Sequence, residues 1–196
     1  MKSKKFLIGI LVIVATLMLA ACGNDNEETS QEETGQKEND ENMNMDSDSH
    51  EDMDHSSSGE VPDDLEVAED PKFEVGSQVV LKTDHMKGMQ GAEATIVGAY
   101  DTTAYAVSYT PTTGGERVEN HKWVIHEEIA DVGEEPLEPG TEVTINASHM
   151  KGMNGANATI DTAKQTTVYM IDYVPTTGGD KVTNHKWVTG SEVSAE

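Results

Sequence analysis

A block of five residues that could bind a metal ion, His-Met-Lys-Gly-Met, occurs twice in this sequence, at 85–89 and 149–153. Imidazole nitrogen and thioether sulfur are soft donors, and thioether sulfur prefers Cu(I) to Zn, Mg or Ca. The structural alternative is that Met fills gaps at one end of a domain. The candidate ligands in the two blocks are His85, Met86, Met89, His149, Met150 and Met153.

A second repeated block, Asn-His-Lys-Trp-Val, adds His121 and His185. If each copy folds as a small barrel, His121 should approach the His85 loop and His185 the His149 loop. Each set would then hold two imidazoles and one or two thioethers, which suits copper. The alternative is that Asn and His close a hairpin while the Trp fills the core. His126 has no counterpart and is left out of a shared site.

A third cluster lies before the repeats, in a polar, acidic stretch with almost no other apolar side chains. Packing does not account for Met in such a stretch, whereas flexible Met/His tracts can capture copper and nearby carboxylates can concentrate it. A chance cluster is the alternative. The candidates are Met43, Met45, His50, Met53 and His55.

The charge of the chain restricts its partners. The formal net charge is −24 at pH 7, from 37 Asp plus Glu against 13 Lys plus Arg. Such a chain repels phosphate backbones, so nucleic acid is excluded as a partner and metal cations are favoured. There is no EF-hand loop, phosphate-binding loop, HExxH motif or nucleophile elbow, so we expect no enzyme.

The N-terminus predicts an exported lipoprotein. A short basic stretch precedes sixteen uncharged residues, 6–21, and Leu19-Ala20-Ala21-Cys22 resembles the bacterial lipobox. Cleavage would make Cys22 the acylated first residue of the mature chain, on the outer face of the bacterial cytoplasmic membrane. An uncleaved anchor is the alternative. Cys22 is the single Cys, so no disulfide can form within the chain.

Four regions follow from composition and self-similarity. Residues 1–21 form the signal peptide, and 22–70 an acidic tether expected to be disordered because it cannot bury enough apolar surface. Residues 76–129 align without a gap on 140–193, with 29 identities in 54 positions. This duplication defines a first repeat at 71–131 and a second at 132–196.

Each repeat has the alternating pattern of short β-strands. In the first repeat the expected strands are 78–82, 94–99, 104–109 and 122–126, rich in Val, Ile, Thr and Tyr and separated by Gly-containing segments. We therefore predict an all-β protein with two tandem SH3-like barrels of the KOW or Tudor kind, closed so that no strand edge is exposed.

The repeated blocks also resemble a known family. With HMKGM, PTTGG and NHKWV in the same order in each copy, the chain is similar to the YdhK family of bacterial surface lipoproteins over residues 73–193. Some members of that family are extracellular copper-binding proteins encoded with copper-export ATPases. The resemblance implies that the protein binds copper, with Cu(I) favoured, and that it has a functional link to such an ATPase. No firm protein partner is predicted. The resemblance also implies the repeat His and Met residues named above as ligands.

Three functions are compatible with the sequence. The leading hypothesis is a lipid-anchored protein that binds and sequesters Cu(I) or Cu(II) outside the membrane, in copper tolerance. The alternative is a cell-wall or polymer-binding module that uses Tyr100, Tyr105 and Tyr109 as an aromatic groove. The third is a passive surface lipoprotein.

Overall fold

The computed structural model describes residues 56–196. The predicted signal peptide and tether thus fall largely outside the described residues, as do five leader candidates and the predicted lipidation site: Met43, Met45, His50, Met53, His55 and Cys22. Within 56–196, no helix is long and apolar enough to cross a bilayer.

The described part of the chain is built from strands, so the all-β prediction is confirmed. The elements are β1 (Glu66–Val67), β2 (Gln78–Leu81), β3 (Glu93–Tyr109), β4 (Val118–Ile125), η1 (His126–Glu128), β5 (Glu142–Thr144), β6 (Asn157–Tyr173), β7 (Val182–Thr189) and β8 (Val193–Ala195). The strands expected at 94–99 and 104–109 are one continuous strand, β3. No Gly or Pro lies between them to end it.

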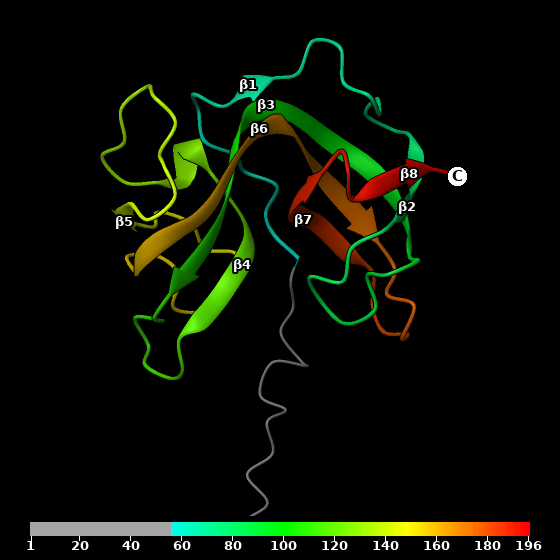
Figure 1. The fold of residues 1–196 in the computed structure, drawn as a ribbon. Coiled ribbons are helices and arrows are strands. Elements are labelled where there is room, and N and C mark those ends of the chain that lie inside the picture. Colours follow the sequence, from blue (N-terminus) through cyan, green and yellow to red (C-terminus); the bar gives the residue numbers. More distant parts are fainter. Residues whose placement is uncertain (1–55) are drawn as a thin grey trace, which may run out of the picture. The chain divides into compact units, whose positions relative to one another are not determined.

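The two long strands β3 and β6 organise the sheet. They pair antiparallel along almost their whole length, from Ala94 opposite Tyr173 to Tyr109 opposite Ala158 (Figure 1). On its other edge, β3 pairs with β1, β2 and β4. On its other edge, β6 pairs with β5 and β7. The last strand, β8, pairs with β2. The result is one open sheet, so the prediction of two closed SH3-like barrels is corrected.

Each hydrophobic core combines halves of both repeats. The first lobe joins the start of repeat 1, with Leu81 and Ile96, to the end of repeat 2, with Ile171 and Val188. The second lobe joins the start of repeat 2 to the end of repeat 1 in the same way. Because β3 and β6 run antiparallel, the beginning of one lies beside the end of the other. The repeats are therefore exchanged rather than folded separately.

A third cluster fills the space between the lobes. Trp123 and Trp187 lie in it, with exposed fractions of 8% and 0%, together with Ala106 of β3 and Met170 of β6. The sequence interpretation of these Trp residues as core residues is confirmed. A shared apolar centre of this kind makes each lobe depend on the other.

Residues 56–70, which precede the first repeat, are part of the fold. Residues 56–70 were expected to belong to the disordered tether, but β1 pairs with β3 and the side chains of Leu65 and Ala68 are buried. The few apolar residues of this segment thus contribute to the core. Residues 56–62 then reach the cleft described next.

Candidate functional site

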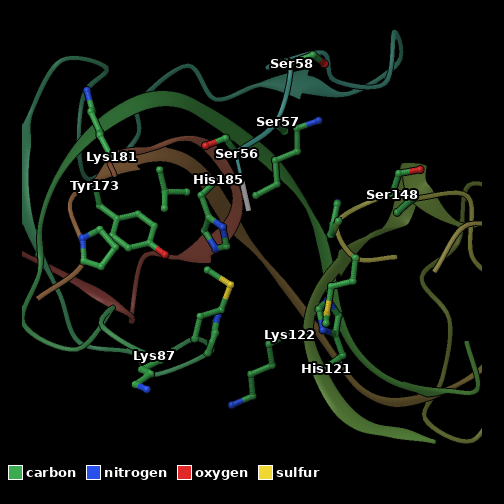
Figure 2. A pocket seen from close by; sticks show the side chains of 18 of the residues that line it. Ser56, Ser57, Ser58, Lys87, His121, Lys122, Ser148, Tyr173, Lys181 and His185 are labelled. Atoms are coloured by element: carbon green, nitrogen blue, oxygen red, sulfur yellow. The ribbon is translucent and has the colours of Figure 1, made fainter. Parts of the chain in front are cut away.

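A cleft of about 1340 Å³ is lined by the repeated His and Met residues. It receives side chains from both lobes and from the Ser56–Pro62 segment. Figure 2 shows His185 beside Tyr173 on one side of the cleft and His121 on the opposite side. Of the eight repeat residues singled out by their chemistry in the sequence, six thus converge on one concave surface, with three on each lobe.

The first set, the His121 site, consists of His121, His149 and Met150 on the second lobe. The ring centroids of His121 and His149 are 6.5 Å apart. Two imidazoles that share one ion at metal–nitrogen distances of about 2 Å have centroids about 5–6 Å apart, so these two rings are slightly farther apart than in such a site. The Tyr109 hydroxyl donates to the Met150 sulfur at 3.9 Å, and the Tyr109 ring stands edge-on to His121.

The second set, the His185 site, consists of His85, Met86 and His185 on the first lobe. Met86 packs against the core of this lobe, and the Tyr173 ring stands edge-on to His185 with centroids 5.8 Å apart. Both sites therefore have the same composition and the same Tyr support, as the duplication requires.

The pairing of the His residues differs from the expected one. We expected His121 to meet the His85 loop, but it lies beside His149. The exchange of β3 and β6 explains this: the second half of each repeat packs on the first half of the other. Each site consequently takes one His from each repeat.

A strand irregularity directs each cleft His. The β3–β4 register shifts on both sides of the Val107–His121 pair, and the β6–β7 register does so around Ile171 and His185. The residue before each His, Asn120 or Asn184, has φ near +51° and +52° respectively. Asn tolerates this left-handed conformation, and bulges of this kind re-aim side chains.

A side-chain acceptor on the neighbouring strand holds each of these Asn residues. The Asn120 backbone N–H donates to the Ser108 hydroxyl at 3.0 Å, and the Asn184 N–H donates to Asp172 at 2.8 Å. These bonds replace the ladder hydrogen bonds that the irregularity interrupts. The local backbone therefore presents both His residues to the cleft in the same way.

Two of the four repeat thioethers are not available to the cleft. Met89 and Met153 are fully buried, each inside the core of its lobe. Packing explains them, and we leave them out of the ligand set. Met86 and Met150 are half-buried and line the cleft.

Sequence reasoning missed two buried carboxylates behind the His residues. Glu128 Oε1 lies 2.7 Å from His149 Nε2, and Glu192 Oε1 lies 2.7 Å from His85 Nε2. Each Glu is the fifth residue after the repeated Trp. A charged residue repeated that soon after a core Trp, between strands, was the signal that could have found them.

The pKa of each carboxyl is lowered. Burial opposes the ionised form of Glu192, but the hydrogen bond and charge of His85, with donors from Thr189 and Trp123, lower its pKa to about 2. Burial opposes the ionised form of Glu128 as well, and the His149 imidazole, with further hydrogen bonds, still lowers that pKa. Both carboxylates are therefore ionised at neutral pH.

The other ring nitrogen of each of these imidazoles, Nδ1, indicates where an ion could bind. Within residues 56–196, Nδ1 of His85 and Nδ1 of His149 are buried and have no hydrogen-bond partner. Buried polar atoms almost always have one, so such an atom calls for an explanation such as a bound ion. No group of three or more His, Cys, Asp and Glu side chains is placed to hold a metal in this same range.

Two of the three Tyr residues proposed for a polymer-binding groove are buried, whereas Tyr100 is half-buried and stands edge-on to Trp187. Tyr105 and Tyr109 are fully buried, as is Tyr169 of the second repeat, and Tyr173 is 2% exposed. A sugar-stacking surface needs exposed ring faces. The burial of Tyr105 and Tyr109 leaves Tyr100 as the partly exposed ring of the three on which that alternative depended.

The comparisons with known proteins agree with this architecture. The family model described as "Protein of unknown function (DUF1541)" matches residues 75–126 and 139–190. The chain is 56% identical over 196 residues to the "Uncharacterized protein YdhK" of Bacillus subtilis (strain 168), covering 100% of this chain and 92% of that protein.

Solved structures of ydhK from Bacillus subtilis are also similar. One crystal structure has a TM-score of 0.72 and 64% identity, and covers 75% of this chain and all of that one. A solution NMR structure of the ydhK C-terminal domain has a TM-score of 0.61 and 66% identity over 63% of this chain and 94% of that one. The protein is thus a tandem-repeat, all-β protein. It belongs to the DUF1541 family, together with YdhK.

Proposed function

We propose that this protein is a non-catalytic copper-binding lipoprotein that holds copper outside the bacterial cytoplasmic membrane. The observation that carries the proposal is the convergence of His and Met from both repeats on one cleft, with the Nδ1 atoms of His85 and His149 buried and unpartnered. A cation bound to these atoms would supply the missing interaction.

The donor set favours Cu(I) over other metals. Each site offers two imidazoles and one thioether, and the residues described hold no cluster of three or more His, Cys, Asp and Glu. Structural zinc sites need four ligands of those types, and Ca²⁺ or Mg²⁺ need several oxygens. Cu(I) accepts few ligands and prefers soft ones.

The N-terminal part of the chain supplies the remainder of the proposal. We infer anchoring through acylated Cys22 and additional copper capture by the leader residues Met43, Met45, His50, Met53 and His55, from their sequence pattern. A membrane-attached copper binder would limit the return of exported ions, which suits a functional link to a copper-export ATPase.

Competition titration of the mature chain with a Cu(I) chelator tests the proposal. Cys22→Ser keeps the unlipidated protein free of a reactive thiol. The test variant is Met86→Leu with Met150→Leu, which removes the cleft thioethers. Its matched control is Met89→Leu with Met153→Leu, which removes the same number of thioethers from the cores. The cleft pair should weaken binding about tenfold or more, and the core pair should leave it unchanged.

Two outcomes contradict the proposal. Equal affinities for the cleft and core variants would remove the cleft from the ligand set. A full-length mature chain that never competes with the chelator would remove copper altogether. A separate variant of the leader, with Met43, Met45 and Met53 changed to Leu, should lower the number of ions bound without changing the cleft affinity.

A further inference from the structure

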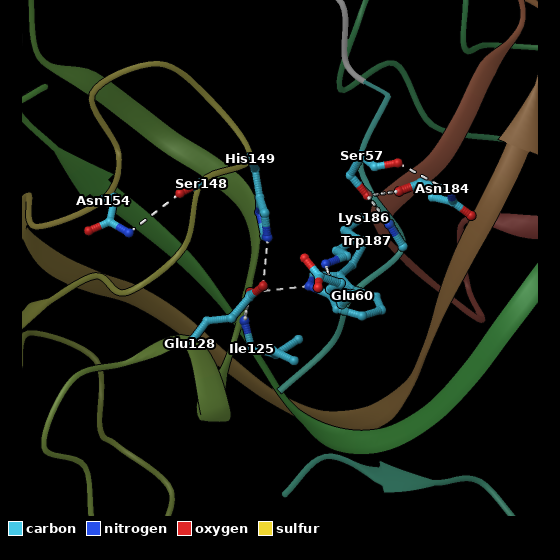
Figure 3. Close-up of polar contacts among 11 residues, drawn as sticks. Ser57, Glu60, Ile125, Glu128, Ser148, His149, Asn154, Asn184, Lys186 and Trp187 are labelled. Atoms are coloured by element: carbon cyan, nitrogen blue, oxygen red, sulfur yellow. Dashed lines mark hydrogen bonds and ion pairs between the residues drawn. The ribbon is translucent and has the colours of Figure 1, made fainter. Parts of the chain in front are cut away.

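Two of the four cleft imidazoles, those of His149 and His85, are each backed by a carboxylate whose other oxygen is already occupied. Glu128 Oε2 accepts from Trp187 Nε1 at 3.1 Å and from the Ile125 backbone N–H at 3.2 Å, while Oε1 faces His149 (Figure 3). Trp187 comes from the first lobe's strand β7 and Glu128 from η1 on the second. The carboxylate therefore joins the lobes as well as contacting the imidazole.

The other site has the same arrangement with the repeats exchanged. Glu192 Oε2 accepts from Trp123 Nε1 at 2.8 Å and from the Thr189 backbone N–H at 2.8 Å, while Oε1 faces His85 at 2.7 Å. The His85 and His149 side chains are each 10% exposed. The same geometry thus recurs at both sites, as the duplication requires.

These contacts fix the tautomer of the imidazoles. Trp and backbone N–H groups can only donate, so the carboxylates act as acceptors, and an ionised carboxylate has no proton to give. The proton of each 2.7 Å contact must then lie on Nε2 of His85 or His149. Nδ1 has no acceptor within reach, and a proton there would be a buried, unsatisfied donor, which is costly. In the neutral imidazole, which is the form that binds a metal, the single proton therefore lies on Nε2 and Nδ1 carries the lone pair.

We propose that Nδ1 of His149 and Nδ1 of His85 are the metal-binding atoms, and that Glu128 and Glu192 are positioning residues that hold these imidazoles in the tautomer able to bind. Carboxylates that accept a hydrogen bond from a ligand imidazole orient the ring and raise its basicity. This inference deepens the proposed function and rests on it. The ligand atom would be Nδ1, and each Glu would act through the imidazole that it contacts.

The tautomer can be measured in the copper-free protein by long-range ¹H–¹⁵N NMR, with signals assigned by single His→Gln variants. We expect His85 and His149 to be protonated at Nε2 and unprotonated at Nδ1. Cu(I) is diamagnetic, and its addition should shift the Nδ1 resonances while both Nε2 protons remain. Protonation at Nδ1 without metal, or a Cu(I) shift at Nε2, would overturn the assignment.

Glu128→Gln tests the positioning role directly. The amide oxygen can keep the bonds from Trp187 and Ile125, but the NH₂ group then faces His149 Nε2 and favours the proton on Nδ1. We expect Cu(I) affinity at the His121 site to fall about 10- to 100-fold and the His185 site to be unchanged. The matched control is Glu127→Gln, which removes the neighbouring charge and should leave both sites intact.

The outcomes separate this inference from the proposed function. A folded Glu128→Gln protein with normal affinity, or with the Nε2–H tautomer retained at His149, contradicts the positioning role. If Glu128→Gln does not fold, the wild-type tautomer and the Cu(I)-induced shifts decide. Copper bound with no Nδ1 shift overturns this inference alone, whereas absence of copper binding to the full chain overturns both.

Discussion

The His121 and His185 sites have the same residue types, but their surroundings differ. The Ser56–Glu60 segment lies along β7 beside the His185 site: Ser57 N–H donates to Thr183 O at 3.0 Å, and Asn184 Nδ2 donates to Ser57 O at 3.2 Å. The corresponding Asn120 on β4 is exposed. His185 is accordingly buried, at 7% exposure, whereas His121 is half-buried.

This comparison separates what duplication copied from what the rest of the chain added. The proposed ligands, the supporting Tyr and the carboxylate are of the same residue types in both sites. The segment before the repeats exists once, so it can cover one site. We expect the His121 site to exchange copper faster and the His185 site, which the Ser56–Glu60 segment covers, to exchange it more slowly.

The largest effect is expected from the Trp that joins the lobes. Trp187→Ala should cost about 3–5 kcal/mol of stability, because it leaves a cavity and removes a donor from buried Glu128. Although Trp187 belongs to the strand of His185, copper binding should be damaged at the His121 site. Urea unfolding and Cu(I) titration measure the two effects.

Trp123→Ala is the mirror experiment and should damage the His185 site instead, because Trp123 donates to Glu192. If Trp187→Ala instead weakened the His185 site and Trp123→Ala the His121 site, the hydrogen bonds from Trp to Glu across the lobes would not control copper binding.

The next largest effect is expected from the removal of one proposed ligand, which should affect one site and not the other. His121→Gln should lower the affinity of its own site by about 100-fold or more, beyond the range expected for a positioning residue, and leave the His185 site unchanged. Chelator competition should show one tight cleft ion fewer.

His126→Gln is the matched control, because His126 bonds Tyr105 and Gly133 outside the cleft. An equal loss in the control would show that the effect is not one of ligation.

Acid should destabilise the fold through the two carboxylates. The pKa of Glu192 is lowered from 4.5 to about 2, so its contribution to the free energy of unfolding is present above about pH 4.5 and lost as the pH falls towards about 2. Glu192→Gln should be less stable than wild type near neutral pH and should lose less stability on acidification.

Urea unfolding at several pH values between about 6 and 2 measures this. If the free energy of unfolding of Glu192→Gln fell with decreasing pH as steeply as that of wild type, Glu192 would not be the titrating group.

The smallest effect concerns the covering segment. Ser57→Ala removes the hydroxyl bond to Asn184 O and should cost about 1 kcal/mol or less. Its sharper readout is kinetic, since copper release from the His185 site should become a few times faster while that from the His121 site stays the same. Ser58→Ala, whose hydroxyl contacts Glu60 in solvent, is the control, and equal rates in all three proteins would remove the role of the segment.

Several features of the fold and the site were accessible from sequence. The β class followed from the alternating pattern, and the duplication from the blocks that recur 64 residues apart. The candidate cleft donors His121, His149, Met150 and their counterparts were found from residue type alone. The buried Met89 and Met153 could not be distinguished from them, because residue type carries no information about which side of a loop faces the core.

The partners of each His were decided by tertiary structure. Local patterns predict strands and turns, but whether a strand pairs within its own repeat or with the other depends on contacts distant in sequence. The continuous β3–β6 ladder joins halves of different repeats, and this brings His121 to His149 and Trp187 to Glu128. The sequence determined which groups are present, and the antiparallel pairing of two long strands determined which of them meet.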